Sequence, residues 1–124
     1  MPIGEKIRRY HRYHKRYEVD WDASLEASFQ DFTGEVQGKV INFSVTGALL
    51  HLDQLYIDGQ HLIVVQHKPK LNLKMFSPEG VLESRIEIRW YDRSAEVNTF
   101  QVGVKLIDII KKNQEVIDRL ISGL

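Results

Sequence analysis

The residues of this sequence with the clearest chemical potential are arginines near its beginning. Arg12 and Arg16 stand four positions apart, and Arg8 precedes Arg12 by the same interval. Residues four apart share a face in a helix and also in an extended chain, so both guanidinium groups can reach one ligand. Arginine forms paired hydrogen bonds with phosphate or with the O6 and N7 atoms of guanine, and its planar guanidinium group also stacks on bases. The spacing fits an anion-binding pair, although such pairs are also common on solvated helices.

The charge around this pair is strongly asymmetric, although the formal net charge of the chain is zero. Between positions 5 and 16 the single acid Glu5 is set against Lys6, Arg8, Arg9, Arg12, Lys15 and Arg16. Local charge of this kind predicts an anionic partner for the N-terminal segment, with a solvated basic tail as the alternative. We expect residues 1–16 to form a flexible basic segment that carries the arginine pair.

A second polar group, Asn42-x-Ser44-x-x-Gly47, falls between two predicted strands. Asparagine offers both a donor and an acceptor, and serine offers a hydroxyl. Glycine permits the positive φ that a tight strand connection often needs. The group can therefore be a ligand-facing turn or an ordinary turn, and the residues alone leave both interpretations open.

The residue patterns of enzymes and metal proteins do not occur in this sequence. It has no glycine-rich phosphate loop, no serine elbow and no carboxylate pair at a telling spacing, and it contains no cysteine. His11 and His14 stand three apart and His61 and His67 six apart, but no acidic residue completes a ligand set. We therefore expect a protein that is not an enzyme, with no catalytic residues, no metal and no cofactor.

Alternation of apolar and polar residues predicts the strands that must position these groups. The expected strands are Val19–Phe29, Glu35–Ile41, Ala48–Leu52, His61–Val65, Leu71–Phe76, Leu82–Trp90 and Phe100–Leu106. Trp21 and Trp90 each lie on the apolar side of their strand, so we expect both to anchor the core instead of facing a ligand.

After Ile107 the apolar spacing becomes helical and predicts a C-terminal helix. Its expected apolar face is Leu106, Ile110, Ile117, Leu120, Ile121 and Leu124. A length of 124 residues, 43% of them apolar, fits a single domain. We predict a mainly β fold over residues 17–124, a small six- or seven-stranded antiparallel β-barrel whose C-terminal α-helix covers one mouth.

The sequence carries no sign of export or membrane insertion. It opens Met-Pro-Ile-Gly-Glu-Lys without an apolar stretch behind it, and no later apolar run approaches the roughly 20 residues that span a bilayer. A cytoplasmic location without membrane insertion is the expectation.

The order of these features resembles the PilZ domain family. The arginine pair is followed, about twenty-five residues later, by the Asn42-x-Ser44-x-x-Gly47 group. Arg85–Trp90 is similar to the late strand of the family, and Gln101–Asp108 is similar to its closing Gly-Val-x-Phe segment, with Leu106 in place of phenylalanine. The resemblance covers most of residues 8–110.

The resemblance implies a non-catalytic receptor for the bacterial second messenger cyclic di-GMP. Arg12 and Arg16 would grip phosphate and guanine, and Asn42, Ser44 and Gly47 would form the facing turn. Arg8 and Arg9 would add further contacts, because Arg8 and Arg12 offer an overlapping register of the same motif. Ordering of the N-terminal segment on binding would pass the signal to a downstream protein, which the sequence does not identify.

Two other functions compete with this interpretation. A small barrel with a basic arm could bind single-stranded nucleic acid, but the later strands lack the exposed aromatic ladder that base stacking requires, so this partner is not expected. A PilZ-like adaptor that binds only proteins is the second alternative, and the complete set of polar ligand-binding groups disfavours it.

Overall fold

The computed structural model describes residues 15–93 and 99–123 of the chain. These residues form, in order, β1 (Tyr17–Ser28), β2 (Thr33–Phe43), β3 (Gly47–Leu52), β4 (Tyr56–Ile57), β5 (Gln60–His61), β6 (Lys70–Ser77), β7 (Gly80–Arg93), β8 (Phe100–Leu106) and α2 (Ile109–Gly123). The mainly β fold with a C-terminal helix is therefore confirmed.

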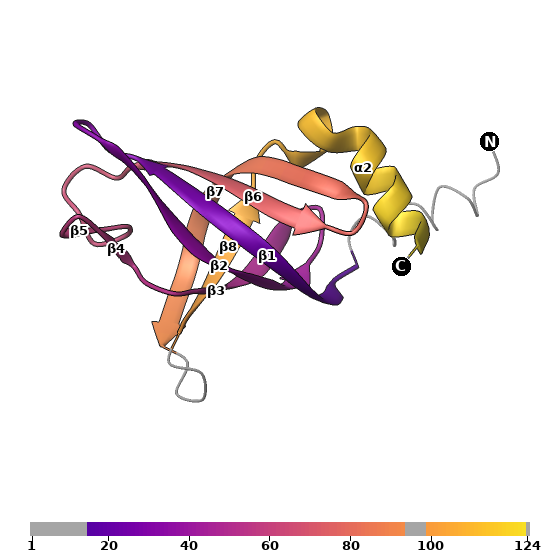
Figure 1. Ribbon diagram of the computed structural model, residues 1–124, viewed down its shortest axis with the longest axis horizontal. Helices are drawn as coiled ribbons and strands as arrows, with labels where there is room; N and C mark the ends of the chain where they lie inside the picture. Colours follow the sequence, from indigo (N-terminus) through magenta and orange to yellow (C-terminus); the bar gives the residue numbers. More distant parts are fainter. Residues whose placement is uncertain (1–14, 94–98, 124) are drawn as a thin grey trace.

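Within the described residues, six strands close into a barrel in the order β1-β2-β3-β8-β7-β6 (Figure 1). Every neighbouring pair is antiparallel, including the closing pair of β1 with β6. Closure leaves these strands with partners on both sides, which removes the open edges that would otherwise invite association. The predicted antiparallel barrel is confirmed.

The barrel core is built from the apolar side of the alternating strands. Leu25, Val36, Leu50 and Leu73 are each at most 1% exposed. Trp21 is also buried, and its ring centroid lies 5.2 Å from that of Phe43. Trp21 thus anchors the core as its position in the alternation predicted.

A short insertion, residues 53–69, lies at the end of the molecule opposite α2 (Figure 1). It contains the β4–β5 hairpin, whose turn places Asp58 at φ 48° and Gly59 at φ 80°. Leu55 and Leu62 are 1% and 2% exposed, so the insertion is attached through its own apolar side chains.

The expected strand His61–Val65 is wrong, because only Gln60–His61 pairs with Tyr56–Ile57 and residues 62–67 form bends. The Nδ1 atom of His61 accepts the backbone N–H groups of Ile63 at 3.0 Å and Val64 at 2.9 Å. In a strand these N–H groups would form hydrogen bonds with a neighbouring strand. Because the imidazole of His61 accepts them instead, the chain bends where the apolar residues predicted an extended strand.

The helix α2 packs along β7, with Ile109, Ile117, Leu120 and Ile121 buried. Ile110, expected on the apolar face, is instead 42% exposed. The helix is interrupted at Asn113, which has φ −133° and ψ 30° and is itself buried. This interruption breaks the helical period on which the predicted face depended, and Leu106 belongs to β8 instead of the helix.

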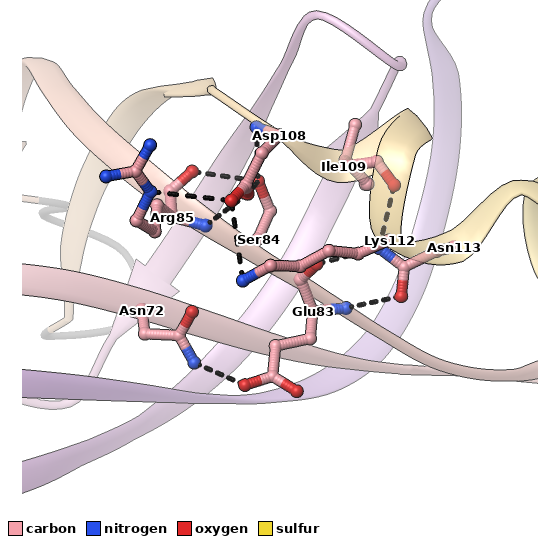
Figure 2. A network of polar contacts seen from close by, with 8 residues as sticks. All are labelled: Asn72, Glu83, Ser84, Arg85, Asp108, Ile109, Lys112 and Asn113. Atoms are coloured by element: carbon pink, nitrogen blue, oxygen red, sulfur yellow. Dashed lines mark hydrogen bonds and ion pairs between the residues drawn. The ribbon is translucent and has the colours of Figure 1, made fainter.

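Asn113 joins the helix to β7 through two hydrogen bonds between its side chain and the backbone of Glu83, as a neighbouring strand would (Figure 2). Its Oδ1 accepts the backbone N–H of Glu83 at 3.1 Å, and its Nδ2 donates to the Glu83 carbonyl at 2.7 Å. The β7–β8 register begins only at Ile86 and Leu106, so the start of β7 extends past β8. In this extension β8 does not pair with β7, and the side chain of Asn113 supplies hydrogen bonds to the β7 backbone instead.

Asp108, directly before α2, completes this junction (Figure 2). One of its carboxylate oxygens accepts the backbone N–H of Arg85 at 2.9 Å, and the other lies 3.4 Å from Nζ of Lys112. Desolvation by burial tends to raise the pKa of Asp108, but the Arg85 N–H and the Lys112 ammonium outweigh it and lower this pKa. The carboxylate is therefore negatively charged directly before the first residue of the helix, where the helix dipole favours an anion.

Among the helices of the described residues, none has the length and apolar character that a membrane crossing requires.

Candidate functional site

The structure brings together two of the polar residues singled out in the sequence, Arg16 and Asn42. Arg16 directly precedes β1 and Asn42 lies near the end of β2, and the antiparallel register pairs Glu18 with Asn42. The Nη1 atom of Arg16 donates a hydrogen bond to Oδ1 of Asn42 at 3.1 Å. This contact orients an exposed guanidinium whose remaining N–H groups can receive an anion.

Ser44 lies beneath the surface of the site and shapes the connection between β2 and β3. Its side chain is 2% exposed. The hydroxyl donates to the carbonyl of Gly47 and accepts the Gly47 N–H, both at 3.2 Å, and the backbone N–H of Ser44 reaches the same carbonyl at 2.9 Å. The serine therefore holds the turn in its shape, and its hydroxyl is already engaged.

Gly47 begins β3 at a place where the chain passes close to two neighbours. A Cβ atom here would lie 2.8 Å from the carbonyl oxygen of Val104 and 3.5 Å from Nη2 of Arg16. Within the described residues the glycines with positive φ are Gly59 and Gly80, so Gly47 does not use the positive φ that glycine permits. Glycine is needed here because it lets Arg16 and β8 approach the turn.

Irregular pairing places Asn42 on the outer face of the barrel. Val40 and Phe43 are both fully buried although they stand three positions apart. The β2–β3 register shifts between Val40 and Asn42, so the inward and outward phase of β2 changes by one residue. Without this bulge Asn42 would share the inward face of Val40.

A second register shift, between Ile88 and Trp90 of β7, overturns the predicted position of Trp90. Strict alternation from Leu82 and Ile86 would direct the indole into the core. The bulge at Arg89 changes the phase, and Trp90 is 49% exposed instead of buried. Trp90 is thus a surface residue of the site and was wrongly expected in the core.

The two bulges align a row of residues across four adjacent strands. Asn42 pairs with Leu49, Leu49 with Gly103, and Gly103 with Trp90. A hollow of about 210 Å³ lies over this row, lined by Arg16, Asn42, Ala48, Leu49, Arg89, Trp90, Gly103 and Val104. The site combines two arginines, an amide, a large aromatic ring and an apolar floor, which suits a planar, anionic ligand.

Six residues of this hollow were not recognised as site residues from the sequence: Ala48, Leu49, Arg89, Trp90, Gly103 and Val104. Arg89 is paired only loosely with Glu87, at 3.7 Å, and both side chains are 57% exposed, so the guanidinium can exchange this partner for a ligand. One signal was present, because a glycine inside a strand often marks a close approach. Gly103 has this role, since the indole of Trp90 occupies the space where a Cβ would stand.

Several predicted site residues fall outside the described residues. Arg8, Arg9 and Arg12 belong to residues 1–14, so their place in the site stays a prediction. His11 and His14 are in the same segment. Among the residues that the structure does describe, no group of three or more metal-ligating side chains occurs.

A larger hollow of about 460 Å³ lies between the tip of the β1–β2 hairpin and the insertion. Its walls include the stacked rings of Phe29 and Phe32, together with Tyr56 and His61. Neither arginine nor lysine lines it, and Asp31 adds negative charge. Although this hollow is larger than the one beside Arg16, the residues that line it do not favour an anionic ligand.

Comparison with known proteins gives a consistent result. The family model of the PilZ domain matches residues 6–123. No curated protein matches the chain. A similar solved structure is the PilZ domain with c-di-GMP of YcgR from Escherichia coli, at TM-score 0.60 and 10% identity, covering 90% of this chain and 88% of that one. Another is the Borreliella burgdorferi PlzA protein in complex with c-di-GMP, at TM-score 0.50 and 13% identity, covering 98% of this chain and 58% of that one.

Proposed function

The chain belongs to the PilZ domain family, and we propose that it is a receptor that binds cyclic di-GMP and performs no chemistry on it. Arg16 and Asn42 form the described part of the binding site, and Ser44 and Gly47 shape the turn behind them. Arg12 is proposed as the second arginine, with Arg8 and Arg9 as additional contacts. The two solved structures named above, each with a similar fold, are described as containing c-di-GMP.

The observation that carries this proposal is the hydrogen bond between Arg16 and Asn42. It joins two motifs 26 residues apart at the edge of a hollow. Guanine presents the O6 and N7 acceptors that arginine recognises, and the phosphates present negative charge to the same guanidinium groups. One small region of surface thus offers complementary groups to both parts of a guanine dinucleotide.

The dimensions of the hollow support a site that is completed by further residues. A volume of about 210 Å³ is below the range of roughly 300–1,000 Å³ that encloses a whole drug-sized ligand. The hollow can hold one base, and the remaining parts of the ligand would contact other groups. Arg12, four residues before Arg16, is the first candidate for these contacts.

Single-stranded nucleic acid is the competing ligand, and the described surface disfavours it. Nonspecific single-strand binding uses several aromatic platforms along a basic groove. The hollow near Arg16 contains one aromatic side chain, Trp90, beside the acidic partner of Arg89. A compact guanine ligand matches this arrangement better than a long polyanion.

The proposal is tested by calorimetric titration of the full chain with cyclic di-GMP, cyclic di-AMP and a short single-stranded DNA. Adenine carries an amino donor at the position where guanine carries O6, so arginine discriminates between the two bases. We expect clear binding of cyclic di-GMP and much weaker binding of the other two ligands. Equal affinity for both dinucleotides would rule out base recognition, and no binding of cyclic di-GMP would refute the receptor function.

We also propose how binding is communicated. Residues 1–16 would become ordered against the barrel when the dinucleotide bridges Arg12 and Arg16, and the ordered segment would form a surface for a downstream protein. The proposal is supported by the charge of this segment, in which six basic residues face one acidic residue. Mutual repulsion of these charges disfavours order until an anion neutralises them.

A further inference from the structure

We propose that His61 is a pH-sensitive switch, which holds residues 63–67 of the insertion in a bent conformation only while its imidazole is neutral. Neither His61 nor this segment lines the hollow beside Arg16. The inference therefore goes beyond the proposed function and does not depend on it. It gives a role to the insertion, which the receptor site does not use.

The first observation is that two backbone N–H groups converge on one ring nitrogen. The Nδ1 atom of His61 accepts the N–H of Ile63 at 3.0 Å and the N–H of Val64 at 2.9 Å. A ring nitrogen that accepts hydrogen bonds carries no proton, so the imidazole is neutral and its proton is on Nε2. Protonation of Nδ1 would turn this acceptor into a donor that faces two other donors, and both hydrogen bonds would be lost.

The second observation is that the bent segment has a local preference for a different conformation. Ile63, Val64 and Val65 are β-branched, and such residues favour extended strands. The sequence accordingly predicts a strand over His61–Val65, whereas the structure has bends at residues 62–67. The imidazole therefore holds the segment against its local preference, and the extended conformation is the alternative once the two hydrogen bonds are lost.

The third observation is that this segment can change while the chain on either side of it stays in place. Before the segment, the N–H of Leu62 donates to the carbonyl of Leu55 at 2.9 Å, and both leucines are buried. After it, Lys70 begins β6, which pairs with β1. Between these attached ends Val64 is 68% exposed, so its movement costs little buried apolar surface.

Groups from neighbouring parts of the fold face His61. The ring of Tyr56 in β4 lies edge-on at 4.9 Å between centroids, and the ring of Tyr91 in β7 lies at 5.8 Å. Asp31, in the β1–β2 turn, and His67 line the same hollow as His61. The carboxylate of Asp31 would favour a positive imidazole and a protonated His67 would oppose it. These two charges act in opposite directions, so we expect the hydrogen bonds at Nδ1 to determine which form of His61 the bent segment binds.

The direction of the pH dependence follows from these contacts. The bent segment binds the neutral imidazole, and histidine is the side chain that changes its charge between about pH 5 and 8. The bend is therefore present at the upper end of this range and is lost as the pH falls. Residues 64–67 line the hollow of about 460 Å³. Protonation of His61 would thus change one wall of this hollow and the surface that the insertion presents.

The test is a pH titration of the full chain without ligand, from about pH 8 to about pH 5, followed by nuclear magnetic resonance. The backbone amide signals of Ile63 and Val64 should shift together, with the same midpoint as the ring signals of His61. Exchange of these two amides, corrected for its intrinsic pH dependence, should become roughly twofold to tenfold faster, as expected for the loss of one hydrogen bond each.

The variant His61→Asn separates the bend from its pH dependence. The Oδ1 atom of asparagine accepts backbone N–H groups a few residues later in the chain, as Nδ1 of His61 does, but it does not titrate. In this variant the two amide signals should barely move over the same pH range. In His61→Ala they should already lie, at the upper end of the range, where those of the wild type lie at the lower end.

His67→Asn is the matched control, because His67 is an exposed histidine that lines the same hollow. It should leave the joint shift of the two amide signals in place. The switch is refuted if the His61 ring titrates while the amides of Ile63 and Val64 stay unchanged, or if the ring stays neutral over the whole range. An equal shift of the amides in His61→Asn would also refute it, because another group would then cause the change. If His61→Ala unfolds, the wild type and His61→Asn still decide.

Discussion

At the scale of single residues, the structure separates groups that are exposed at the hollow from groups that hold the neighbouring turn in place. Arg16 lies at the surface and bonds to Asn42, whereas Ser44 is buried and its hydroxyl contacts the backbone of its own turn. A residue with free N–H groups and solvent access can bind a ligand without a large change in the fold. A buried hydroxyl acts on binding through the shape of the turn.

This distinction predicts the behaviour of Arg16→Ala and Asn42→Ala. Each removes one partner of the hydrogen bond at 3.1 Å, and Arg16→Ala also removes a charge that would contact the ligand. Loss of a charge-assisted hydrogen bond costs about 1.5–3 kcal/mol, or roughly tenfold to hundredfold in affinity for cyclic di-GMP. The thermal midpoint of the free protein should barely change, because neither change leaves a cavity.

Titration and thermal denaturation of these variants measure the two effects separately. Arg119→Ala is the matched control, because this arginine of α2 has a side chain that is 53% exposed and lies outside the hollow. Arg8→Ala tests the register of the arginine pair and should cost distinctly less than Arg16→Ala. Equal losses at positions 8 and 16 would mean that the other register is used, and melting of the Arg16→Ala fold would make Arg16 structural.

At the scale of elements, irregularities in regular structure determine what the barrel presents to a ligand. The bulges in β2 and β7 each change the phase of one strand and turn Asn42 and Trp90 outward. The interruption of α2 at Asn113 lets a helical residue bond to the backbone of β7. Each irregularity interrupts a local pattern and gains a contact between elements.

The role of Asn113 can be tested by Asn113→Ala. The change removes the hydrogen bonds to the N–H and carbonyl of Glu83 and to the carbonyl of Ile109. Leaving these buried and partly buried backbone groups without partners costs about 1–3 kcal/mol, which corresponds to a thermal midpoint roughly 4–12 °C lower for a domain of this size. Affinity for cyclic di-GMP should change little, because the affected part of β7 is remote from Trp90 in the strand.

Glu115→Ala is the control for this measurement, since Glu115 belongs to the same helix and is exposed. An unchanged thermal midpoint in Asn113→Ala would show that the helix is held by its apolar face alone. A large loss of ligand affinity in a folded Asn113→Ala protein would instead connect the helix to the site.

At the scale of the whole molecule, the barrel separates three regions. Helix α2 and the insertion lie at opposite ends of the molecule (Figure 1). The row from Asn42 to Trp90 crosses four adjacent strands of the barrel wall. Each barrel strand has hydrogen-bonded neighbours on both sides, so moving one strand would break hydrogen bonds to two others. We therefore propose that binding at this wall alters the molecule mainly through the chain that precedes β1, which carries the arginine pair.

Hydrogen exchange should therefore report a local change when cyclic di-GMP binds. Ordering of the backbone costs roughly 1–2 kcal/mol per residue, and charge neutralisation by the ligand would offset it in residues 1–16. Amide exchange in these residues should slow on ligand addition. The insertion, residues 53–69, is the internal control and should keep its exchange rates. An unchanged N-terminal pattern at saturating ligand would contradict the proposed switch.

The sequence by itself determined the features that depend on neighbours along the chain. Alternating residues identified the barrel strands, and the helical spacing after Ile107 identified α2. These predictions succeed because the side-chain period of a strand or helix is a local property.

The tertiary structure alone decided which way several of those side chains point. Trp90 faces outward because β7 slips by one residue against β8, Gly47 is needed because Val104 and Arg16 pass close to it, and His61 ends a strand by binding backbone N–H groups. Each outcome depends on a partner elsewhere in the fold, and a bulge changes phase only relative to the strand beside it. The local sequence therefore determines where the strands occur. The pairing between strands determines which side chains the hollow exposes.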